Sequence, residues 1–449
     1  MTSPDEPLLS HPPAAVGMDP DALHEAWPIL SPEERLEGVE MLDAVTGAEF
    51  FLDLRVRDQA DLLERLGPER RRAWMRLLAP DDAADLIQEL DEERRPGYLA
   101  LLDDTTLREV LALLAYEEDE AGGLMNPRYM RARPDITVEV AIRYLRRQAV
   151  RGIEVIDYAY VLDREGLLLG VVSFRELFAA PPDRLVSDIM ETEPVTVAEE
   201  TDQEAVARLL VDSGLLALPV VDEAGRMKGV VTADDIVEVV QEEATEDIQK
   251  IGGTEALDEP YLQIGLWSMV RKRGVWLAVL LVGEMLTATA MGFFEEEIAR
   301  AVVLALFIPL IISSGGNSGS QAATLVIRAM ALGEVQLRDW WRVVRRELAA
   351  GLALGALLGL MGLVRILAWE GATGAYGANA LPLGATVAVS LMGVVLFGTL
   401  AGSMLPLLLR RVGLDPASAS APLVATLVDV TGLIIYFTVA AALLTGTLL

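Results

Sequence analysis

The second half of the sequence contains five apolar segments that are each long enough to cross a lipid bilayer. A helix needs about 20 apolar residues to span the hydrocarbon core, and lipid offers no partners for unpaired backbone groups. These segments therefore predict an α-helical membrane domain of five spans. They cover residues 274–293, 299–324 with a soft centre, 349–369, 381–408 and 421–444.

Basic residues gather at one end of these spans. Arg271, Lys272 and Arg273 precede the first span, and Arg410 and Arg411 follow the fourth. Four more arginines follow the second span, whereas the loop after the first span is acidic. Because the cytoplasmic loops of membrane proteins are enriched in Lys and Arg, we expect a multi-pass protein of the cell membrane. Its N-terminus is predicted to lie in the cytoplasm and its C-terminus outside.

The charge of the chain is unevenly distributed. It carries 68 Asp and Glu against 37 Lys and Arg, a net charge of -31. From Tyr261 onward there are 12 basic and 10 acidic residues, which leaves 25 basic and 58 acidic residues before it. So acidic a surface repels nucleic acid, and we expect no nucleic-acid partner. Divalent cations such as Mg²⁺ prefer carboxylate and water oxygens, although a merely solubilising acidic surface is the alternative.

The sequence has few of the residue types that enzymes use for catalysis. Cysteine is absent, which excludes disulfides, Cys-ligated zinc and thiol nucleophiles. The two histidines, His11 and His24, both lie near the start of the chain. We find no Walker-type phosphate loop and no nucleophile–base pair. We therefore expect that the protein is not an enzyme.

The part before the spans opens with helical repeats. Residues 1–19 read as a disordered leader, and residues 20–122 as an all-α, superhelical N domain. Within it, residues 58–66 are echoed by residues 82–90, and Glu69-Arg-Arg is echoed by Glu93-Arg-Arg, 24 residues further on. A fixed period of this length indicates stacked helical hairpins, each of which buries an apolar stripe against the next.

A second repeat follows at an offset of 59 residues, where residues 160–176 match residues 219–235. Each copy predicts a strand, a turn, a strand and a helix capped by Ser173 or Thr232. The pattern resembles a tandem pair of α/β CBS domains, at residues 123–184 and 185–241. CBS pairs often bind adenine nucleotides such as ATP, which would involve Ser173, Glu176, Thr232 and Asp235. The alternative is that these residues only cap helices.

Residues 242–270 connect the repeats to the membrane domain, residues 271–449. The charged start of the connector predicts a helix, which Gly252 and Gly253 would end. The expected fold is therefore multidomain, with a helical N domain, a CBS pair, a connecting helix and five membrane spans.

The last span carries a single carboxylate, Asp429, near its middle. A charged side chain at the centre of a bilayer costs about 3 kcal/mol on insertion scales, so such residues usually face a water-filled path. Asp429 is therefore the first candidate for an ion site, and a purely structural or protonated Asp is the alternative. Glu284 in the first span is a second acid, which belongs to the ion path, pairs with Thr287 or Thr289, or is protonated.

The second span contains a small polar stretch, Ser-Ser-Gly-Gly-Asn-Ser-Gly-Ser-Gln, at residues 313–321. Such residues are unfavourable against lipid, but they can line a cavity or let helices pack closely. We interpret the stretch as lining a pore, with close helix packing as the alternative.

These parts, in this order, resemble MgtE-type magnesium transporters over nearly the whole chain. The resemblance rests on Tyr-Glu-Glu-Asp-Glu-Ala-Gly-Gly-Leu-Met at 116–125, Ala-Thr-Glu-Asp-Ile at 244–248, Gly-Gly-Asn-Ser-Gly at 315–319 and Pro-Leu-Val-Ala-Thr-Leu-Val-Asp-Val-Thr-Gly at 422–432. Ala421 and Ser320 depart from the family, because relatives can have Asn at both places.

The resemblance implies a homodimeric Mg²⁺ channel for magnesium uptake, with a pore between the protomers that the second and fifth spans line. Mg²⁺ is then both substrate and regulator, because cytosolic Mg²⁺ bound among the N domain, the CBS pair and the plug helix holds the pore closed. Asp429 and Ala425 are the implied pore residues for the metal. The implied pore lining is Gly315, Gly316, Asn317, Gly319, Thr426 and Thr431, and the implied regulatory acids are Glu246, Asp247, Glu255, Asp258 and Asp415.

Two further hypotheses stay open. Asp429 and Glu284 together would permit a less selective divalent-cation channel or a cation-coupled exchanger with nucleotide sensing by the CBS pair. Alternatively, the protein is chiefly a nucleotide or Mg²⁺ sensor whose membrane part is an anchor, in which case Asp429→Ala would leave its function intact.

Overall fold

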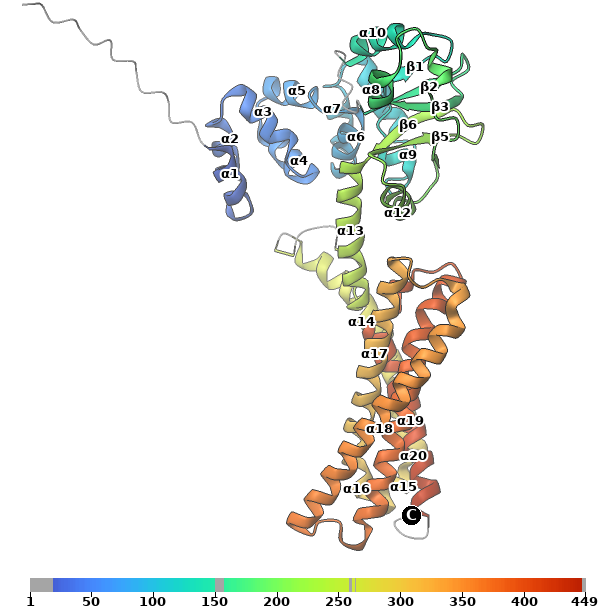
Figure 1. The fold of residues 1–449 in the computed structure, drawn as a ribbon. Coiled ribbons are helices and arrows are strands. Elements are labelled where there is room, and N and C mark those ends of the chain that lie inside the picture. The colour runs from blue at the N-terminus through green and yellow to red at the C-terminus, as the bar shows by residue number, and fades with distance from the viewer. Residues whose placement is uncertain (1–18, 150–156, 258–260, 263, 446–449) are drawn as a thin grey trace, which may run out of the picture. The chain divides into compact units, whose positions relative to one another are not determined.

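The computed structural model describes residues 19–149, 157–257, 261–262 and 264–445 (Figure 1). The chain divides into two compact units, Met1–Gln241 and Glu242–Leu449. The first contains a helical domain followed by two small sheets, and the second contains the long apolar helices. The predicted multidomain fold class is thus confirmed.

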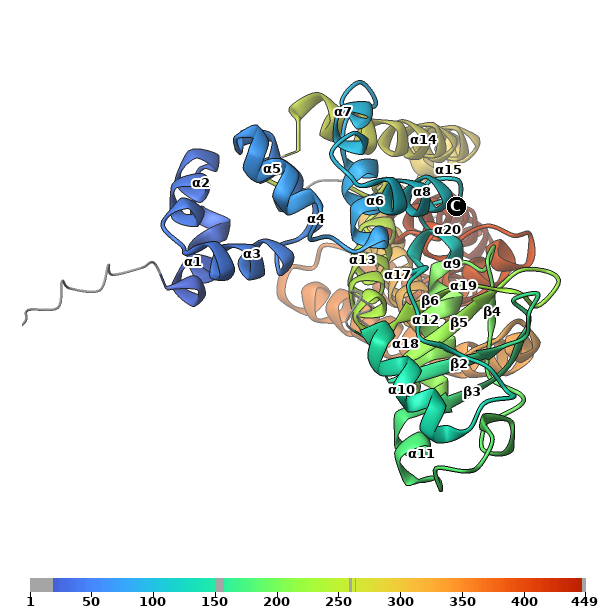
Figure 2. The same ribbon diagram turned by 90° about the horizontal axis from the view of Figure 1, so that it is seen from above.

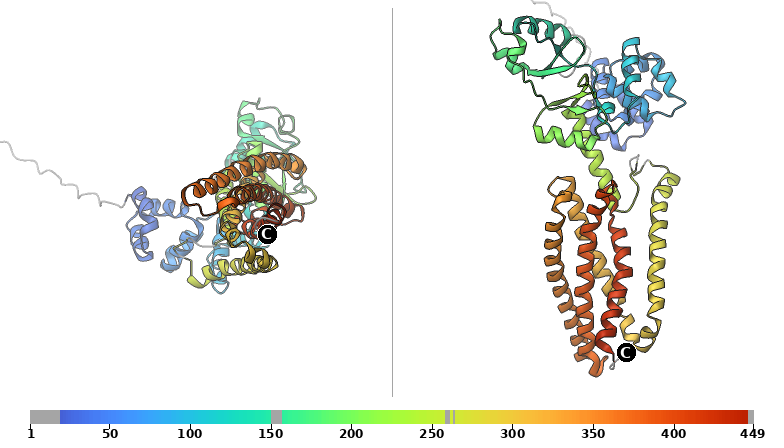
Figure 3. Two further views of the ribbon diagram at one scale, coloured as in Figure 1. Left: turned by 90° about the horizontal axis from the view of Figure 1, so that it is seen from below. Right: turned by 90° about the vertical axis from the view of Figure 1, so that its right-hand side faces the viewer.

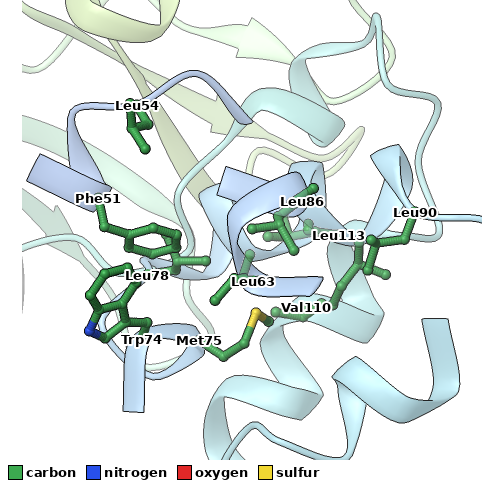
Figure 4. Close-up of a cluster of buried hydrophobic side chains, with 14 of the residues drawn as sticks. Phe51, Leu54, Leu63, Trp74, Met75, Leu78, Leu86, Leu90, Val110 and Leu113 are labelled. Carbon is green, nitrogen blue, oxygen red and sulfur yellow. The ribbon is translucent and has the colours of Figure 1, made fainter. Parts of the chain in front are cut away.

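The helical domain begins the first unit. Its helices are α1 (Pro20–Ala26), α2 (Pro32–Glu40), α3 (Ala44–Leu52), α4 (Val56–Arg65), α5 (Pro68–Met75), α6 (Pro80–Glu89), α7 (Arg95–Leu99), α8 (Asp104–Leu113) and α9 (Ala121–Leu124). Helices α6 and α8 lie side by side, as Figures 1 and 2 both show. Apolar side chains from successive helices meet in one core (Figure 4), to which Phe51, Leu63, Met75, Leu86 and Val110 contribute.

The 24-residue repeat has a visible structural basis. Arg71 donates to the carbonyl of Leu66, directly after α4, and Arg95 donates to the carbonyl of Leu90, directly after α6. A helix end leaves carbonyls without intrahelical partners. The repeated arginine therefore caps the preceding helix in both copies.

Two three-stranded sheets follow, and their topology is identical. Strands β1 (Arg131–Ala132), β2 (Tyr158–Leu162) and β3 (Leu168–Ser173) form the first sheet, and β4 (Val197–Ala198), β5 (Ala217–Val221) and β6 (Met227–Thr232) form the second. The first two strands of each sheet run parallel and the last two antiparallel. The helices of this region are α10 (Val138–Ala149), α11 (Phe174–Ala179), α12 (Gln203–Ser213) and α13 (Ala233–Ile251).

The second unit consists mainly of helices long and apolar enough to cross a membrane, five in the described residues. They are α14 (Leu266–Phe293), α16 (Val302–Ala305) joined to α17 (Ile308–Ala331), α18 (Trp340–Thr373), α19 (Ala380–Arg411) and α20 (Ala421–Leu444), while α15 (Glu295–Arg300) links the first two spans. The right panel of Figure 3 shows them side by side, with α14 at the edge of the bundle beside α20. Short 3₁₀ turns of the chain are Trp27–Ile29, Val186–Asp188, Leu337–Asp339, Gly377–Asn379 and Pro416–Ser418.

The helices extend beyond several of the predicted span limits. Helix α14 begins at Leu266, α18 begins at Trp340 and α17 continues to Ala331, because charged residues at a membrane surface keep helical backbone bonds while their long side chains reach water. The soft centre expected in the second span lies between α16 and α17. The glycine-rich stretch itself is continuous helix. Helix α13 ends at Ile251, directly before Gly252 and Gly253, as predicted.

Candidate ion-binding sites

A groove of about 390 Å³ runs along the contact between α17 and α20 in the second unit. Its walls come from one face of α17 and from two residues of α20 that are one turn apart, Ala425 and Asp429. The α17 residues repeat at helical spacing, so they lie on a single face of the helix. They are Pro309, Ile312, Ser313, Gly316, Asn317 and Ser320. Asp429 is therefore placed against the glycine-rich stretch, as predicted.

Two glycines of that stretch have a packing role. A Cβ on Gly319 would approach the Val424 side chain to 2.7 Å and the Gly398 carbonyl to 2.9 Å. A Cβ on Gly315 would approach Val428 to 2.7 Å. Real Cβ atoms are not found so close to backbone, and small residues are what allows membrane helices to approach. Gly315 and Gly319 therefore hold α17 against α19 and α20 and do not line the groove.

The neighbouring residues of the stretch do line it. Gly316 faces Ala425, whose Cβ would lie 3.4 Å from an added methyl group, and Asn317 is exposed in the groove wall. The stretch therefore packs closely against neighbouring helices on one side of α17 and contributes residues to the groove on the other.

The two predicted threonines of α20 lie outside the groove. Thr426 is 9% exposed and packs against Gly283 of α14. The Thr431 hydroxyl donates to the Leu427 carbonyl at 2.7 Å within its own helix. Such a bond satisfies a hydroxyl without any ligand.

Glu284 lies beside the pore candidate. The contact between Gly283 and Thr426 brings α14 against α20, and the next residue of α14, Glu284, is close enough for its carboxyl group to interact with that of Asp429. Of the three roles considered for Glu284, the structure therefore favours association with the Asp429 site over pairing with a threonine of its own helix.

The two positions that depart from the family contact each other. The Ser320 hydroxyl donates to the Ala421 carbonyl at 3.1 Å, which ties the middle of α17 to the first turn of α20. A short hydroxyl that bonds to backbone thus connects the two helices at the mouth of the groove.

The first unit contains a separate acidic cavity of about 310 Å³. It lies where the start of α6, the start of α13 and the residue before β2 come together. Its lining is Asp81, Asp82, Asn126, Asp157, Leu216, Thr232, Ala233, Asp234 and Asp235. Asp81 is only 8% exposed, and its Oδ1 has no hydrogen-bond partner among the described residues. Carboxylates this close together and this poorly solvated repel one another.

Burial and mutual repulsion alter the acidity of these groups. Burial, followed by the charges of Asp82 and Asp235, raises the pKa of Asp81 well above its usual value. Burial raises the pKa of Asp235 to about 6, although hydrogen bonds from Thr232 act in the opposite direction. Burial and the charge of Asp82 also raise the pKa of Asp85. A cation in the cavity would favour the charged forms.

The four residues considered for nucleotide binding act as helix caps. Ser173 and Glu176 form a reciprocal capping box on α11, with the Ser173 hydroxyl 2.8 Å from the Glu176 carboxylate. The Thr232 hydroxyl lies 2.7 Å from the Asp235 carboxylate at the start of α13. Only the second pair also faces the acidic cavity, whose charge opposes a bare phosphate.

Two of the predicted regulatory acids, Glu246 and Asp415, meet at one basic side chain. Glu246 and Asp415 both contact the Lys250 ammonium group, with 2.7 Å between Nζ and the Asp415 carboxylate. Glu255 is exposed, and Asp247 lies on α13. Asp258 lies outside the described residues. No three acidic or histidine side chains in the described parts of the chain are close enough to enclose a metal ion.

Sequence reasoning missed Asp81, Asp82 and Lys250. The sequence does mark the place of the two aspartates. In the 24-residue repeat, Asp81 and Asp82 of the second copy correspond to Arg57 and Asp58 of the first. The change from a basic to an acidic residue at an otherwise repeated position indicates a local function. Lys250 could also have been noticed in the sequence, because it is the only basic residue between 241 and 260.

Family comparisons cover most of the chain. The MgtE divalent cation transporter family matches residues 308–439, the MgtE intracellular N domain matches residues 18–119, and the CBS domain matches residues 121–183 and 186–242. The groove and the acidic cavity both lie within matched regions.

Curated relatives match across several of these regions. The magnesium transporter MgtE of Thermus thermophilus is 47% identical over 343 residues, which cover 76% of this chain and 74% of the relative. That of Enterococcus faecalis is 34% identical over 74% of this chain and 71% of the relative. The crystal structure of the cytosolic domain of the Mg²⁺ channel MgtE in complex with ATP is 43% identical over 49% of this chain and 90% of that chain, with a TM-score of 0.47.

Proposed function

Since the chain belongs to the MgtE family of magnesium transporters, we propose that it is a Mg²⁺-selective channel whose ion path follows the groove between α17 and α20. The observation that carries this proposal is the position of Asp429, the only ionisable residue among the groove-lining side chains. Mg²⁺ sheds its water reluctantly and is often bound through water. The Asp429 carboxylate can attract a hydrated ion, while small residues such as Gly316 and Ala425 leave room for its water shell.

The exposure of the groove supports a homodimer. Ser313, Asn317, Gln321 and Thr324 form an exposed polar stripe on a helix that is long enough to span the membrane. A polar stripe against lipid is unfavourable, whereas one that lines a water-filled path between two copies is not. Two chains facing each other through α17 and α20 would close the path and bring two Asp429 carboxylates to it. The cytoplasmic N-terminus and the outside C-terminus belong to this proposal.

Cytosolic Mg²⁺ is the proposed closing signal. In the first unit, carboxylates of the helical domain and of the second CBS-like repeat share one cavity, and their repulsion falls when a divalent cation binds. A hydrated ion suits a cavity that offers no enclosing set of three ligands. Low cytosolic Mg²⁺ would leave the acids repelling one another, which favours the open channel and magnesium uptake.

Regulation by a nucleotide is a second candidate for the CBS pair. The Thr232 and Asp235 pair faces the acidic cavity, so the physically reasonable ligand is ATP accompanied by a divalent cation. A cation-coupled exchanger or a less selective divalent channel is the alternative for the membrane domain, and the contact between Glu284 and Asp429 is the observation that favours it.

Reconstituted magnesium flux tests the pore. Asp429→Asn should reduce Mg²⁺ uptake into vesicles at least tenfold, because the groove loses the only ionisable side chain of its lining, while thermal stability stays close to that of the unmodified protein. Glu347→Gln is the matched control, since Glu347 is a carboxyl within α18 and outside the groove. Equal fluxes in Asp429→Asn and the unmodified protein would exclude the groove as the ion path.

A further inference from the structure

The end of α13 is docked onto the start of α20. Gly253 has φ +75°, a conformation that favours glycine, and a Cβ at this position would lie 3.0 Å from the Pro422 side chain and 2.8 Å from the indole nitrogen of Trp276. Ile251 packs against the apolar core that α17, α19 and α20 share. The connector is therefore in contact with the first turn of the helix that carries Asp429.

A lysine holds this contact electrostatically. The Lys250 ammonium group bonds to Glu246, one turn earlier on α13, and lies 2.7 Å from Asp415, which precedes α20. The side chains of Lys250 and Asp415 are 29% and 37% exposed. Asp415 is itself fixed, because its other oxygen accepts from the Ala417 amide at 2.8 Å.

The pKa of Lys250 agrees with this geometry. Burial alone would lower the pKa of Lys250, but hydrogen bonds to Asp415 and Glu246 outweigh it and raise the pKa above the usual value. The ammonium group is therefore charged throughout the physiological pH range.

A cation between carboxylates of two elements is the arrangement that a bridging divalent ion would create. We propose that Lys250 is a built-in cationic latch, which holds the end of α13 against the start of α20 without Mg²⁺. The proposal rests on closure by cytosolic Mg²⁺, to which it adds a contact that is always present.

The latch has a defined effect on gating. A tethered ammonium group is present at a constant and high local concentration, so it stabilises the docked connector at every Mg²⁺ level. A divalent ion at Glu246 and Asp415 would have to displace the lysine. Mg²⁺ bound elsewhere therefore needs to supply only the remainder of the closing free energy, and the channel closes at a lower Mg²⁺ concentration than it would without Lys250.

Two measurements on the full-length protein test the latch. In vesicles, Lys250→Gln should raise the Mg²⁺ concentration that halves the flux about twofold to fivefold, the range expected for partly exposed ion pairs, with the maximal flux unchanged. The control is Arg300→Gln, which removes another i, i+4 ion pair, to Glu296, on α15. It should leave the half-inhibiting concentration unaltered. An unchanged or lower value in Lys250→Gln would overturn the latch, and a lower value would mean that Mg²⁺ occupies this site in competition with the lysine.

Hydrogen exchange separates the latch from Mg²⁺ gating. Without Mg²⁺, the amides of residues 246–253 should exchange faster in Lys250→Gln than in the unmodified protein, and the exchanged pair Lys250→Asp with Asp415→Lys should restore protection. Equal exchange rates of these amides in Lys250→Gln and in the unmodified protein would contradict the latch, but they would not contradict gating by Mg²⁺. If exchange responds but cytosolic Mg²⁺ never reduces the flux of the unmodified protein, the latch stands and the proposed gating fails.

Discussion

Neighbouring residues of α17 have different surroundings because they point in different directions. Gly315 lies against Val394 and Val428 in the helix packing, whereas Gly316 faces the groove and Ala425. The sequence predicted that this stretch either lines a pore or packs closely. It could not assign the roles to individual glycines, since that depends on which helix covers each face. The helices that cover Gly315 and Gly319 are α19 and α20, and the sequence predicts both spans but not which face of α17 each one covers.

The two glycines give a matched pair of substitutions. Gly315→Ala should destabilise the membrane domain by about 1–3 kcal/mol, because its methyl group would overlap two valines and the helices would have to move apart. Gly316→Ala should leave stability nearly unchanged, because its Cβ would meet Ala425 at about the distance of an ordinary contact, 3.4 Å, but it should lower Mg²⁺ flux by narrowing the groove. Thermal unfolding and vesicle flux, measured on both variants, distinguish the effects. A stable Gly315→Ala protein together with an unstable Gly316→Ala protein would contradict the assignment.

At the scale of elements, the break between α16 and α17 has its own support. The Tyr436 hydroxyl on α20 donates to the Leu304 carbonyl at 3.0 Å, within the last turn before the break. Tyr436 is fully buried, and its ring contacts Phe437, which stacks on Phe294. The interrupted second span is thus fastened to the helix that carries Asp429, and the groove keeps its shape.

Tyr436→Phe should therefore cost about 1 kcal/mol, the usual net value of one buried hydrogen bond. An apparent melting temperature about 2–4 °C lower is expected for a unit of this size. Tyr261→Phe is the control, because Tyr261 is 68% exposed, and it should not change the melting temperature. A Tyr436→Phe protein as stable as the unmodified one would show that the bond to Leu304 has no structural weight.

The order of the elements could be predicted from the sequence, because repeats and apolar spans are local patterns. The offset of 59 residues correctly relates β2 and β3 to β5 and β6, which have equivalent registers. The limits of the helices that contain the spans were predicted less accurately. Leu266 and Trp340 begin helices beside basic residues, where composition is polar although the backbone is helical. Sequence composition indicates whether a side chain lies in lipid or in water, but it does not indicate whether the backbone at that residue is helical.

At the scale of the whole molecule, acidic side chains line two separate places, the groove in one unit and the cavity in the other. Their positions could be predicted only in part. Asp429 was evident because an acid in an apolar span is rare, whereas Asp81 and Asp82 lay among the many acids of the first part. Only tertiary structure separates a buried acid from a solvated one in so acidic a sequence.

The acidic cavity predicts a dependence of stability on pH. Asp235 has a pKa of about 6 in the folded protein, above the value of about 3.9 expected when unfolded. Between these values the folded state binds more protons, so its stability is greatest at low pH and is lost as the pH rises through about 6. The loss from this group is about 3 kcal/mol.

Hydrogen exchange of α6, corrected for intrinsic rates, measures this effect in the full-length protein. Without Mg²⁺ we expect the amides of α6 to be more strongly protected at pH 5 than at pH 7.5. This difference in protection should be smaller in Asp235→Asn. Added Mg²⁺ should increase the protection mainly at pH 7.5. Protection that increases with pH in the absence of Mg²⁺ would refute the assignment of a strained acid cavity.

The central claim is that Mg²⁺ moves passively past Asp429. Currents across a planar bilayer that contains the purified protein test it most directly, because a divalent ion moving alone reverses at a potential that shifts about 30 mV per tenfold Mg²⁺ gradient. We predict this shift, no movement of the reversal potential with a pH or Na⁺ gradient, and loss of the current in Asp429→Asn. A reversal potential that follows the pH or Na⁺ gradient, or an undiminished current in Asp429→Asn, would contradict the account.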